Sequence, residues 1–240
     1  MDLVPSTSKR AIAGISIAVL LCAATIAQEP NPVDVSRLVN AAVTARFENI
    51  LGFTDVEHYL VYRGDDQSHP VAKMTVKDTY KKGVGKTYSV VSESGSSILL
   101  HFGLKPLLES EQTINQPGNV ERSWFDSANY FMKLNSQPVQ KVNGRACFAL
   151  DIKPKQEAPN LIIGTMWADV QDGNLVRIDG VASKNPSAFS GPTHMMRQYT
   201  NIDGYSMATH ARAESDSPLF GRTVVTIDYS DYKLELKTRK

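Results

Sequence analysis

The sequence predicts an α+β domain built on a curved antiparallel sheet, and three features support this fold class. Leu161–Val181, LIIGTMWADVQDGNLVRIDGV, consists of two apolar runs separated by Asp172-Gly173, which is a strong hairpin signal. Similar runs bounded by Gly, Asp, Asn or Ser bring the expected total to about nine to eleven strands. Helical patterns occur before the strands and once between them. Because most strands alternate apolar and polar residues, we expect one face of the sheet to pack on a core.

Residues 1–27 have the features of a cleaved secretory signal. Two basic residues precede the apolar stretch Ala11–Leu21, and residues 25–27 are suited to a signal peptidase. The apolar stretch is too short for a typical membrane anchor. Cys22 follows a leucine, where lipoprotein signals carry Gly, Ala or Ser, so we expect no lipid anchor there. The sequence therefore predicts export across the inner membrane to the periplasm, with residues 28–236 forming one domain and 237–240 a charged tail.

Charge and cysteine content exclude several classes of function. Of the 26 basic and 25 acidic residues, residues 1–27 hold two and one, so 24 of each remain after cleavage. A net charge of zero argues against nucleic acid binding and against attraction to anionic lipid headgroups. Cys147 is the one cysteine that remains, so the mature chain has no internal disulfide and must be stabilised by burial.

The segment Asn31–Phe53 is predicted to be an amphipathic helix. Pro32 suits a first helical turn, Asp34 or Ser36 can cap it, and Gly52 is expected to end it. One face is formed at three- and four-residue spacing by Val35, Leu38, Val39, Ala42, Val43, Arg46, Phe47, Ile50 and Leu51. This face either packs on the sheet as plain core or closes the mouth of a cavity.

The strand pattern resumes after this helix and continues nearly to the end of the chain. We expect strands at Val56–Arg63, Pro70–Lys81, Thr87–Ser92, Val139–Val142, Ala146–Ile152, both arms of the 161–181 hairpin, Thr193–Tyr199, Ser206–Glu214 and Arg222–Tyr232. A two-residue loop in the hairpin would pair Trp167 with Ile178. Side-chain alternation would then place on one apolar face Ile163, Thr165, Trp167, Val176 and Ile178.

An apolar region with a helical pattern lies between the third and fourth expected strands. Ser97–Leu108 is apolar, and Asn119–Met132 is rich in aromatic residues. We expect one or two short helices here, interrupted at Lys105-Pro106 by the proline. Such an insertion is either a lid over the concave face of the sheet or a plug that fills it, and the sequence leaves both open.

No motif in the chain indicates an enzyme, a metal site or a cofactor. Lys82–Thr87, KGVGKT, resembles the end of a phosphate-binding loop, but Tyr80 replaces a required glycine and a strand follows, so we expect a hairpin turn. The five histidines are scattered, and the chain after residue 27 has no second cysteine for a zinc site. Glu109 and Glu111 lie in a polar helix, which gives no sign of acid/base catalysis.

A surplus of large, adaptable apolar side chains is the feature that favours ligand binding. The candidate ligand-binding residues are Tyr59, Met74, Tyr88, Leu99, Leu100, Phe102, Leu104, Trp124 and Trp167. A domain of this size also needs such residues for its own core. Composition alone therefore leaves ligand binding and core packing open.

The order of features in residues 141–232 resembles the outer-membrane lipoprotein-sorting family of bacterial envelope proteins. The resemblance lies in VNGRACFALDIKPK, GTMWADVQDGNLVRIDG, RQYTNIDGYSMATHARAES and FGRTVVTIDYSDY, in that order. The family has a LolA/LolB-like fold, which it shares with the sigma-factor regulator RseB. The resemblance implies an unclosed half-barrel, a strongly curved antiparallel sheet with helices over its concave face. It also implies that the apolar inside accepts acyl chains of lipoproteins or similar ligands.

The same resemblance sets expectations for partners and for the lid. The 31–53 helix and the 97–108 segment would be the covering helices, and a sheet arginine would bond the lid, with Arg46 and Arg63 as candidates. The implied function is a soluble periplasmic carrier of a lipid or lipidated protein, with an envelope protein as donor or acceptor and only transient membrane contact. The alternative is a regulatory or scaffolding module, RseB-like, that binds another protein.

Overall fold

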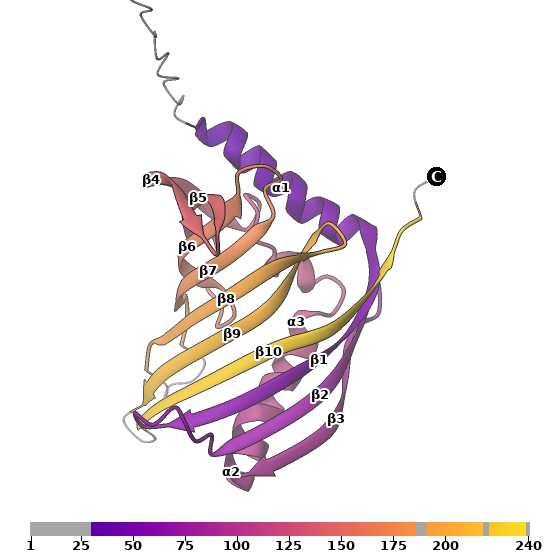
Figure 1. Cartoon of the computed structure of the whole chain (residues 1–240), viewed down its shortest axis with the longest axis vertical. Helices are drawn as coiled ribbons and strands as arrows, with labels where there is room; N and C mark the ends of the chain where they lie inside the picture. The colour runs from indigo at the N-terminus through magenta and orange to yellow at the C-terminus, as the bar shows by residue number, and fades with distance from the viewer. Residues whose placement is uncertain (1–29, 186–190, 218–220, 239–240) are drawn as a thin grey trace, which may run out of the picture.

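The computed structural model describes residues 30–185, 191–217 and 221–238. These residues form one ten-stranded antiparallel sheet in the order β3-β2-β1-β10-β9-β8-β7-β6-β5-β4. The edge strands β3 and β4 do not pair with each other, so the curved sheet stays unclosed (Figure 1). This is the predicted half-barrel. The expected signal peptide and Cys22 lie outside the described residues. Among the described helices, none is both long and apolar enough to span a membrane.

All the expected strands are present, and most extend further than expected. The strands are β1 (Ile50–Arg63), β2 (Ala72–Lys81), β3 (Gly85–Gly95), β4 (Tyr130–Val142), β5 (Arg145–Pro154), β6 (Ile162–Asp169), β7 (Leu175–Ala182), β8 (Thr193–Ile202), β9 (Tyr205–Ser217) and β10 (Gly221–Leu236). The helices are α1 (Pro32–Asn49), α2 (Ser97–Leu99), the π-helix η1 (Leu100–Leu104), α3 (Lys105–Ile114) and the 3-10 helix η2 (Val120–Ser123).

The connection between β3 and β4 explains how the concave face is covered. These strands follow each other in the sequence but lie at opposite edges of the sheet, so the chain between them must cross from one edge to the other. This crossing carries α2, η1 and α3, and Figure 1 shows α3 behind the strands β10, β1 and β2. We call Ser97–Ile114 the cover.

Helix α1 differs from the prediction at both ends. Asn31, rather than Asp34 or Ser36, is the N-cap, and its Oδ1 accepts a hydrogen bond from the amide of Val33 at 3.0 Å. Gly52 does not end the helix, because the chain passes directly from Asn49 into β1. Gly52 instead lies within the strand, where a Cβ atom would stand 2.9 Å from the carbonyl oxygen of Tyr80 on β2. The glycine thus permits close approach of two strands.

The expected break at Lys105-Pro106 is absent, because a π-helical turn accommodates the proline. The amide of Lys105 bonds to the carbonyl of Leu100, five residues back, and Pro106 lies in the first turn of α3. Pro lacks an amide hydrogen, and the widened turn just before it lets the helical path continue. Within the aromatic-rich stretch Asn119–Met132, Val120–Ser123 form η2 and β4 begins at Tyr130.

The hairpin forms where predicted, but its register differs by one residue. The amide of Gly173 bonds to the carbonyl of Asp169, so the loop is longer than two residues, and a bulge follows between Trp167 and Ala168. Trp167 therefore pairs with Arg177, and Met166 pairs with Ile178. A one-residue slip exchanges the two faces of a strand. The predicted apolar face is wrong for β6, whose buried face carries Ile162, Met166 and Ala168.

Two apolar cores occupy the concave side of the sheet. The α1 core joins α1 to the β4–β8 half through Val35, Val39, Val43, Tyr130, Leu150, Ile152, Leu161, Ile162, Met166, Ala168 and Ile178. The cover core joins the cover to the β1–β3 and β9–β10 half through Tyr59, Val61, Ala72, Met74, Val76, Leu100, Leu104, Leu108, Ala211 and Ile227. The buried charged residues described in the next subsection belong to neither core, although several lie on the same strands.

Candidate ligand-binding site

Six of the nine candidate residues come together in the cover core. Tyr59, Met74, Leu100 and Leu104 are at most 5% exposed, while Tyr88 and Leu99 pack against them. Tyr59, Met74 and Tyr88 form part of the sheet floor, and the three leucines belong to the cover. The sequence therefore identified the two apolar surfaces that meet here.

The other three candidate residues lie elsewhere. Phe102 is 82% exposed on the outside of the cover. Trp124 packs against the α1 core and stacks on Phe47, with 4.2 Å between ring centroids. Trp167 alternates with the buried Met166 and so points to the opposite face of the sheet, where its indole N–H donates to Gln140 Oε1 at 3.0 Å.

The cover docks on the sheet through one buried apolar stripe, with Leu99 and Leu107 packed beside it, and Lys105 of the cover lies 3.7 Å from Glu93 of β3. Leu100, Leu104 and Leu108 follow each other at four-residue spacing and are buried, because such residues lie on one helix face. Ile98 and Phe102 face outward and are 67% and 82% exposed. Side chains fill the space between the leucines and the sheet, so a ligand would have to take the place of the stripe.

A buried charged cluster adjoins this core, and the sequence analysis missed it. It consists of Asp55 and Glu57 on β1, Asp78 on β2, Lys86 on β3 and Glu111 on the cover. Lys86 Nζ lies 2.7 Å from Glu57 Oε1, 2.8 Å from Asp78 Oδ2 and 2.9 Å from Glu111 Oε2. The hydroxyl of Tyr59 donates to the second oxygen of Glu57. Lys86 thus ties the cover to three strands.

The excess of carboxylates shifts the ionisation of this cluster. Burial, and then the charge of Glu57, raises the pKa of Asp55 to about 7. Burial, and then the charge of Glu111, raises the pKa of Glu57 to about 8. Burial alone would lower the pKa of Lys86, but Glu111, Glu57 and Asp78 outweigh it and raise that pKa well above its usual value. Lys86 therefore stays charged, while part of the carboxylate excess is neutralised by protons.

Three of these carboxylates are close enough to share a cation. Single oxygens of Asp55, Glu57 and Asp78 lie within 4.8 Å of one another, and all three residues are buried. Hard cations such as Mg²⁺ or Ca²⁺ take oxygen ligands of this kind. The ammonium of Lys86 already contacts Glu57 and Asp78, so the cluster carries its own cation.

Lys86 on β3 is a sheet cation that contacts the cover, and the two arginines named in the sequence analysis lie at other places in the fold. Arg46 lies on α1, where its Nε donates to the carbonyl of Ser206 at 2.9 Å and an Nη contacts Met207 Sδ at 3.8 Å on β9. Arg63 is exposed at the far end of β1, opposite Thr223. Lys86 belongs to the KGVGKT segment, which forms the expected hairpin turn and then the start of β3.

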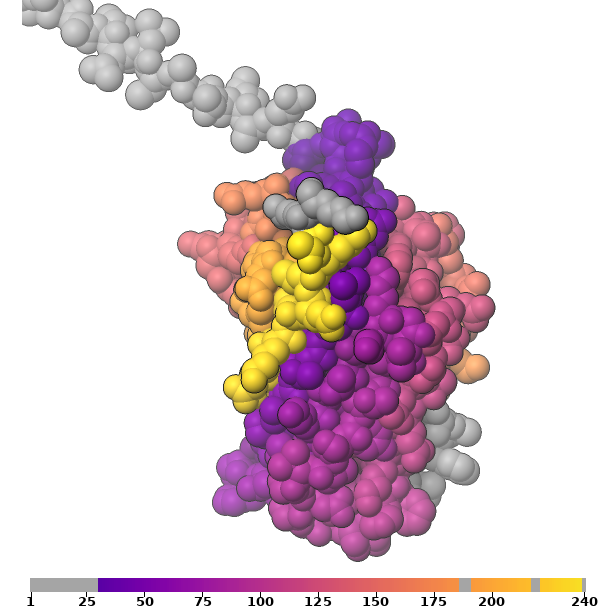
Figure 2. Space-filling model, turned by 90° about the vertical axis from the view of Figure 1, so that its right-hand side faces the viewer, coloured from indigo at the N-terminus to yellow at the C-terminus, as the bar shows by residue number. Residues whose placement is uncertain are grey.

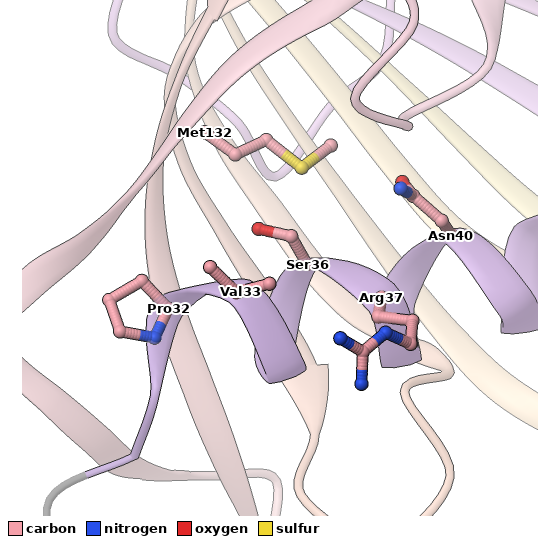
Figure 3. Close-up of a pocket in the computed structure, with 6 residues that line it drawn as sticks. All are labelled: Pro32, Val33, Ser36, Arg37, Asn40 and Met132. Atoms are coloured by element: carbon pink, nitrogen blue, oxygen red, sulfur yellow. The ribbon is translucent and has the colours of Figure 1, made fainter.

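Two surface hollows occur outside the cover core. The first, of about 510 Å³, lies between the start of α1 and β4, and Figure 3 shows Met132 extending over the helix beside Ser36 and Asn40. The second, of about 470 Å³, lies over strands β4 to β6. Neither hollow is lined by a candidate ligand-binding residue.

Comparisons with known proteins give three structural likenesses. The chain matches no family model, and no curated protein matches it. A LolA superfamily protein from Nitrosomonas europaea is 11% identical over 83% of this chain and 93% of its own, with a TM-score of 0.45. A DUF1329 family protein from Desulfovibrio piger is 16% identical over 86% and 94%, with a TM-score of 0.45. An outer membrane lipoprotein-sorting protein domain from Vibrio parahaemolyticus is 14% identical over 82% and 91%, with a TM-score of 0.47.

Proposed function

We propose that this protein is a periplasmic carrier that holds the acyl chains of a lipid or lipidated protein between the sheet and the cover. The observation that supports this most is the way the cover docks. One leucine stripe and the contacts of Glu111 with Lys86 hold a helical segment against a curved apolar floor. The resemblance in strand order noted in the sequence points to the same function.

The energetics allow an acyl chain to replace the stripe. Burial of a leucine side chain contributes about 1.5–3 kcal/mol, and burial of a methylene group contributes about 0.8 kcal/mol. A chain of roughly ten methylene groups therefore gains about as much as Leu100, Leu104 and Leu108 together. The free energies of the state with the cover docked and the state with an acyl chain bound would then be similar. A carrier needs this balance because it must also release its ligand.

Uptake of a fluorescent fatty-acyl probe by the mature chain, residues 28–240, tests this proposal. Leu104→Ala should weaken docking of the cover by about 2–5 kcal/mol and so increase probe uptake. The matched variant Phe102→Ala, two residues away on the outside, should leave uptake unchanged. Native mass spectrometry of protein from a bacterial periplasm should show a lipid-sized adduct that organic extraction removes.

Two results would contradict the carrier. One is a chain that takes up no probe and carries no adduct. The other is uptake that Phe102→Ala abolishes while Leu104→Ala has no effect, because the probe would then bind on the outer surface.

A second candidate function, a scaffold that binds another envelope protein, is supported by the β3 edge. Residues 89–95 of this edge strand are exposed, and Val90 and Val91 are 41% and 65% exposed. Figure 2 shows this side of the molecule, where the purple and magenta surface below the yellow C-terminal strand belongs to β2, β3 and the cover. Exposed edge strands can pair with a strand of a partner. Loss of partner binding in Val91→Pro, with probe uptake absent in the unaltered chain, would favour the scaffold.

A further inference from the structure

The outer, convex face of strands β4 to β7 carries an exposed apolar row. These strands form the end of the sheet away from β3 (Figure 1). Phe131 on β4, Ile163 on β6 and Val181 on β7 are 64%, 37% and 40% exposed. They alternate along their strands with buried residues such as Tyr130 and Ile162, so their side chains point away from the α1 core. Ile163 pairs directly with Val181, so the row continues from one strand to the next.

Three lysines surround Phe131 on this face. Lys153 pairs with Phe131 across β4 and β5, and both residues line the hollow of about 470 Å³ together with Lys133. The ammonium nitrogen of Lys155 lies 5.5 Å from the centroid of the Phe131 ring. All three lysines are exposed, and none of them forms an ion pair within the described part of the chain. The lining of the hollow contains one carboxylate, that of Asp151, so positive charge is in excess here.

An exposed aromatic ring with apolar neighbours and unpaired lysines around it fits an anionic lipid surface. The ring and the aliphatic stems of the lysines can lie at the level of the headgroups and upper acyl chains, while the ammonium groups reach the lipid phosphates. Each lysine near an anionic membrane surface adds to the attraction. Interfaces between proteins are instead depleted of lysine and enriched in arginine, and the three cations around Phe131 are all lysines. The chemistry of this face therefore favours a lipid surface over a protein.

We propose that Phe131 and the lysines around it dock this protein on the surface of a bilayer that contains anionic lipids. The chain after residue 27 has equal numbers of basic and acidic residues, so the attraction comes from this face and the contact is reversible. The face lies on the opposite side of the sheet from the two cores and from the cover. The inference therefore goes beyond the proposed carrier function and does not depend on it.

Flotation of residues 28–240 with lipid vesicles tests the inference. One set of vesicles contains equal parts of phosphatidylglycerol and phosphatidylcholine, and the other contains phosphatidylcholine alone. We expect binding to the anionic vesicles to be at least about tenfold tighter, because each of the three lysines contributes to the attraction. Raising the salt from about 50 mM to about 300 mM should remove most of this difference, because exposed charges are screened.

Two matched pairs of variants locate the contact, all at exposed positions where the fold is expected to be kept. Phe131→Ser should weaken binding to the anionic vesicles at least about tenfold, because the ring no longer enters the lipid. Phe102→Ser changes an exposed ring on the cover and should leave binding unchanged. Lys153→Gln should reduce the preference for anionic vesicles about fivefold, while Lys73→Gln, on the outer face of β2, should keep it.

A fluorescent label at position 131 gives a direct readout. Cys147 is buried, so the variant Phe131→Cys can be labelled at its exposed thiol with a dye whose emission depends on polarity. We expect the emission to shift to shorter wavelength when the anionic vesicles are added. The same dye on Phe102→Cys should show no shift.

Three results would overturn the inference. One is the absence of binding to anionic vesicles at low salt. Another is an equal or larger loss of binding in Phe102→Ser than in Phe131→Ser, which would move the contact to the cover. The third is a shift of the dye at position 131 that needs no vesicles and grows with protein concentration, because this face would then be an interface between two copies of the chain. Vesicle binding without uptake of an acyl probe would contradict the carrier and leave this inference in place.

Discussion

Two helical segments cover the same concave face, and they are held by different forces. Helix α1 buries Val35, Val39 and Val43 in a core with the β4–β8 half of the sheet. The cover buries Leu100, Leu104 and Leu108 against the other half, and it adds the contact of Glu111 with Lys86 inside a charged cluster.

The difference indicates which segment can move. Besides its apolar residues, α1 is held by hydrogen bonds such as that from Arg46 to the carbonyl of Ser206, and its carboxylates Asp34 and Glu48 are exposed, so α1 takes no carboxylate into the interior. The cover, in contrast, takes a carboxylate into an already acidic region, and much of the attraction is offset by the cost of removing charges from water. We therefore expect α1 to be a fixed part of the fold and the cover to undock by itself. The predictions below run from the largest expected effect to the smallest.

Placing a charged residue in the buried face of α1 or of the cover should distinguish the two segments most clearly. Val39→Asp places an unpaired carboxylate at a fully buried position of α1 and should cost more than about 4 kcal/mol, enough to unfold the whole sheet. Leu104→Asp should release the cover and leave the sheet folded. Circular dichroism and hydrogen exchange of the strands distinguish these results. Complete unfolding of Leu104→Asp would contradict the difference between the segments.

Stability should fall as pH rises, because two carboxylates of the charged cluster have raised pKa values in the folded chain. The pKa of Asp55 is about 7 and that of Glu57 about 8 in the folded chain, against about 4 when unfolded. The folded state holds protons that the unfolded state releases, so this stability is full below about pH 4 and is lost as pH rises to about 8.

We expect the free energy of unfolding, from urea titrations, to drop by about 2 kcal/mol or more between about pH 5 and pH 8.5. Glu57→Gln should flatten this dependence, while Glu48→Gln, at an exposed position of α1, should not. A profile that is as steep in Glu57→Gln as in the unaltered chain would show that the cluster is not its cause.

Weakening the ion pair should loosen the cover and not α1. Glu111→Gln removes a charge that contacts Lys86 and should speed hydrogen exchange of α3 about tenfold, which corresponds to about 1.4 kcal/mol. Glu109→Gln, on the exposed side of the same helix, should have no effect. Equal exchange rates in the two variants would mean that the ion pair does not hold the cover.

The smallest effect is expected outside both cores. Trp167→Phe removes the hydrogen bond to Gln140 and should cost about 1 kcal/mol, with uptake of an acyl probe unchanged. A large loss of uptake in this variant would restore Trp167 to the ligand site, which the sheet register argues against.

The sequence predicted the sheet and its two covering segments because their apolar periodicity is local. It could not place Trp167, because the face of a strand depends on a bulge and on loop length, and both follow from tertiary contacts. It also missed the charged cluster, although a signal was present. Alternation along β2 puts Asp78 on the face of Met74 and Val76, and alternation along β1 does the same for Asp55 and Glu57 with Tyr59. That these three carboxylates and Glu111 gather around Lys86 depends on strand pairing and on the path of the cover.

Native-state hydrogen exchange, followed by mass spectrometry in low urea, tests the central claim most directly. The claim is that the cover opens while α1 and the sheet stay folded. We expect amides of residues 100–114 to exchange through an opening that costs at least about 2 kcal/mol less than the opening that exposes α1. If both segments exchange only through global unfolding, with the same free energy, the cover is a fixed plug and the carrier mechanism is wrong.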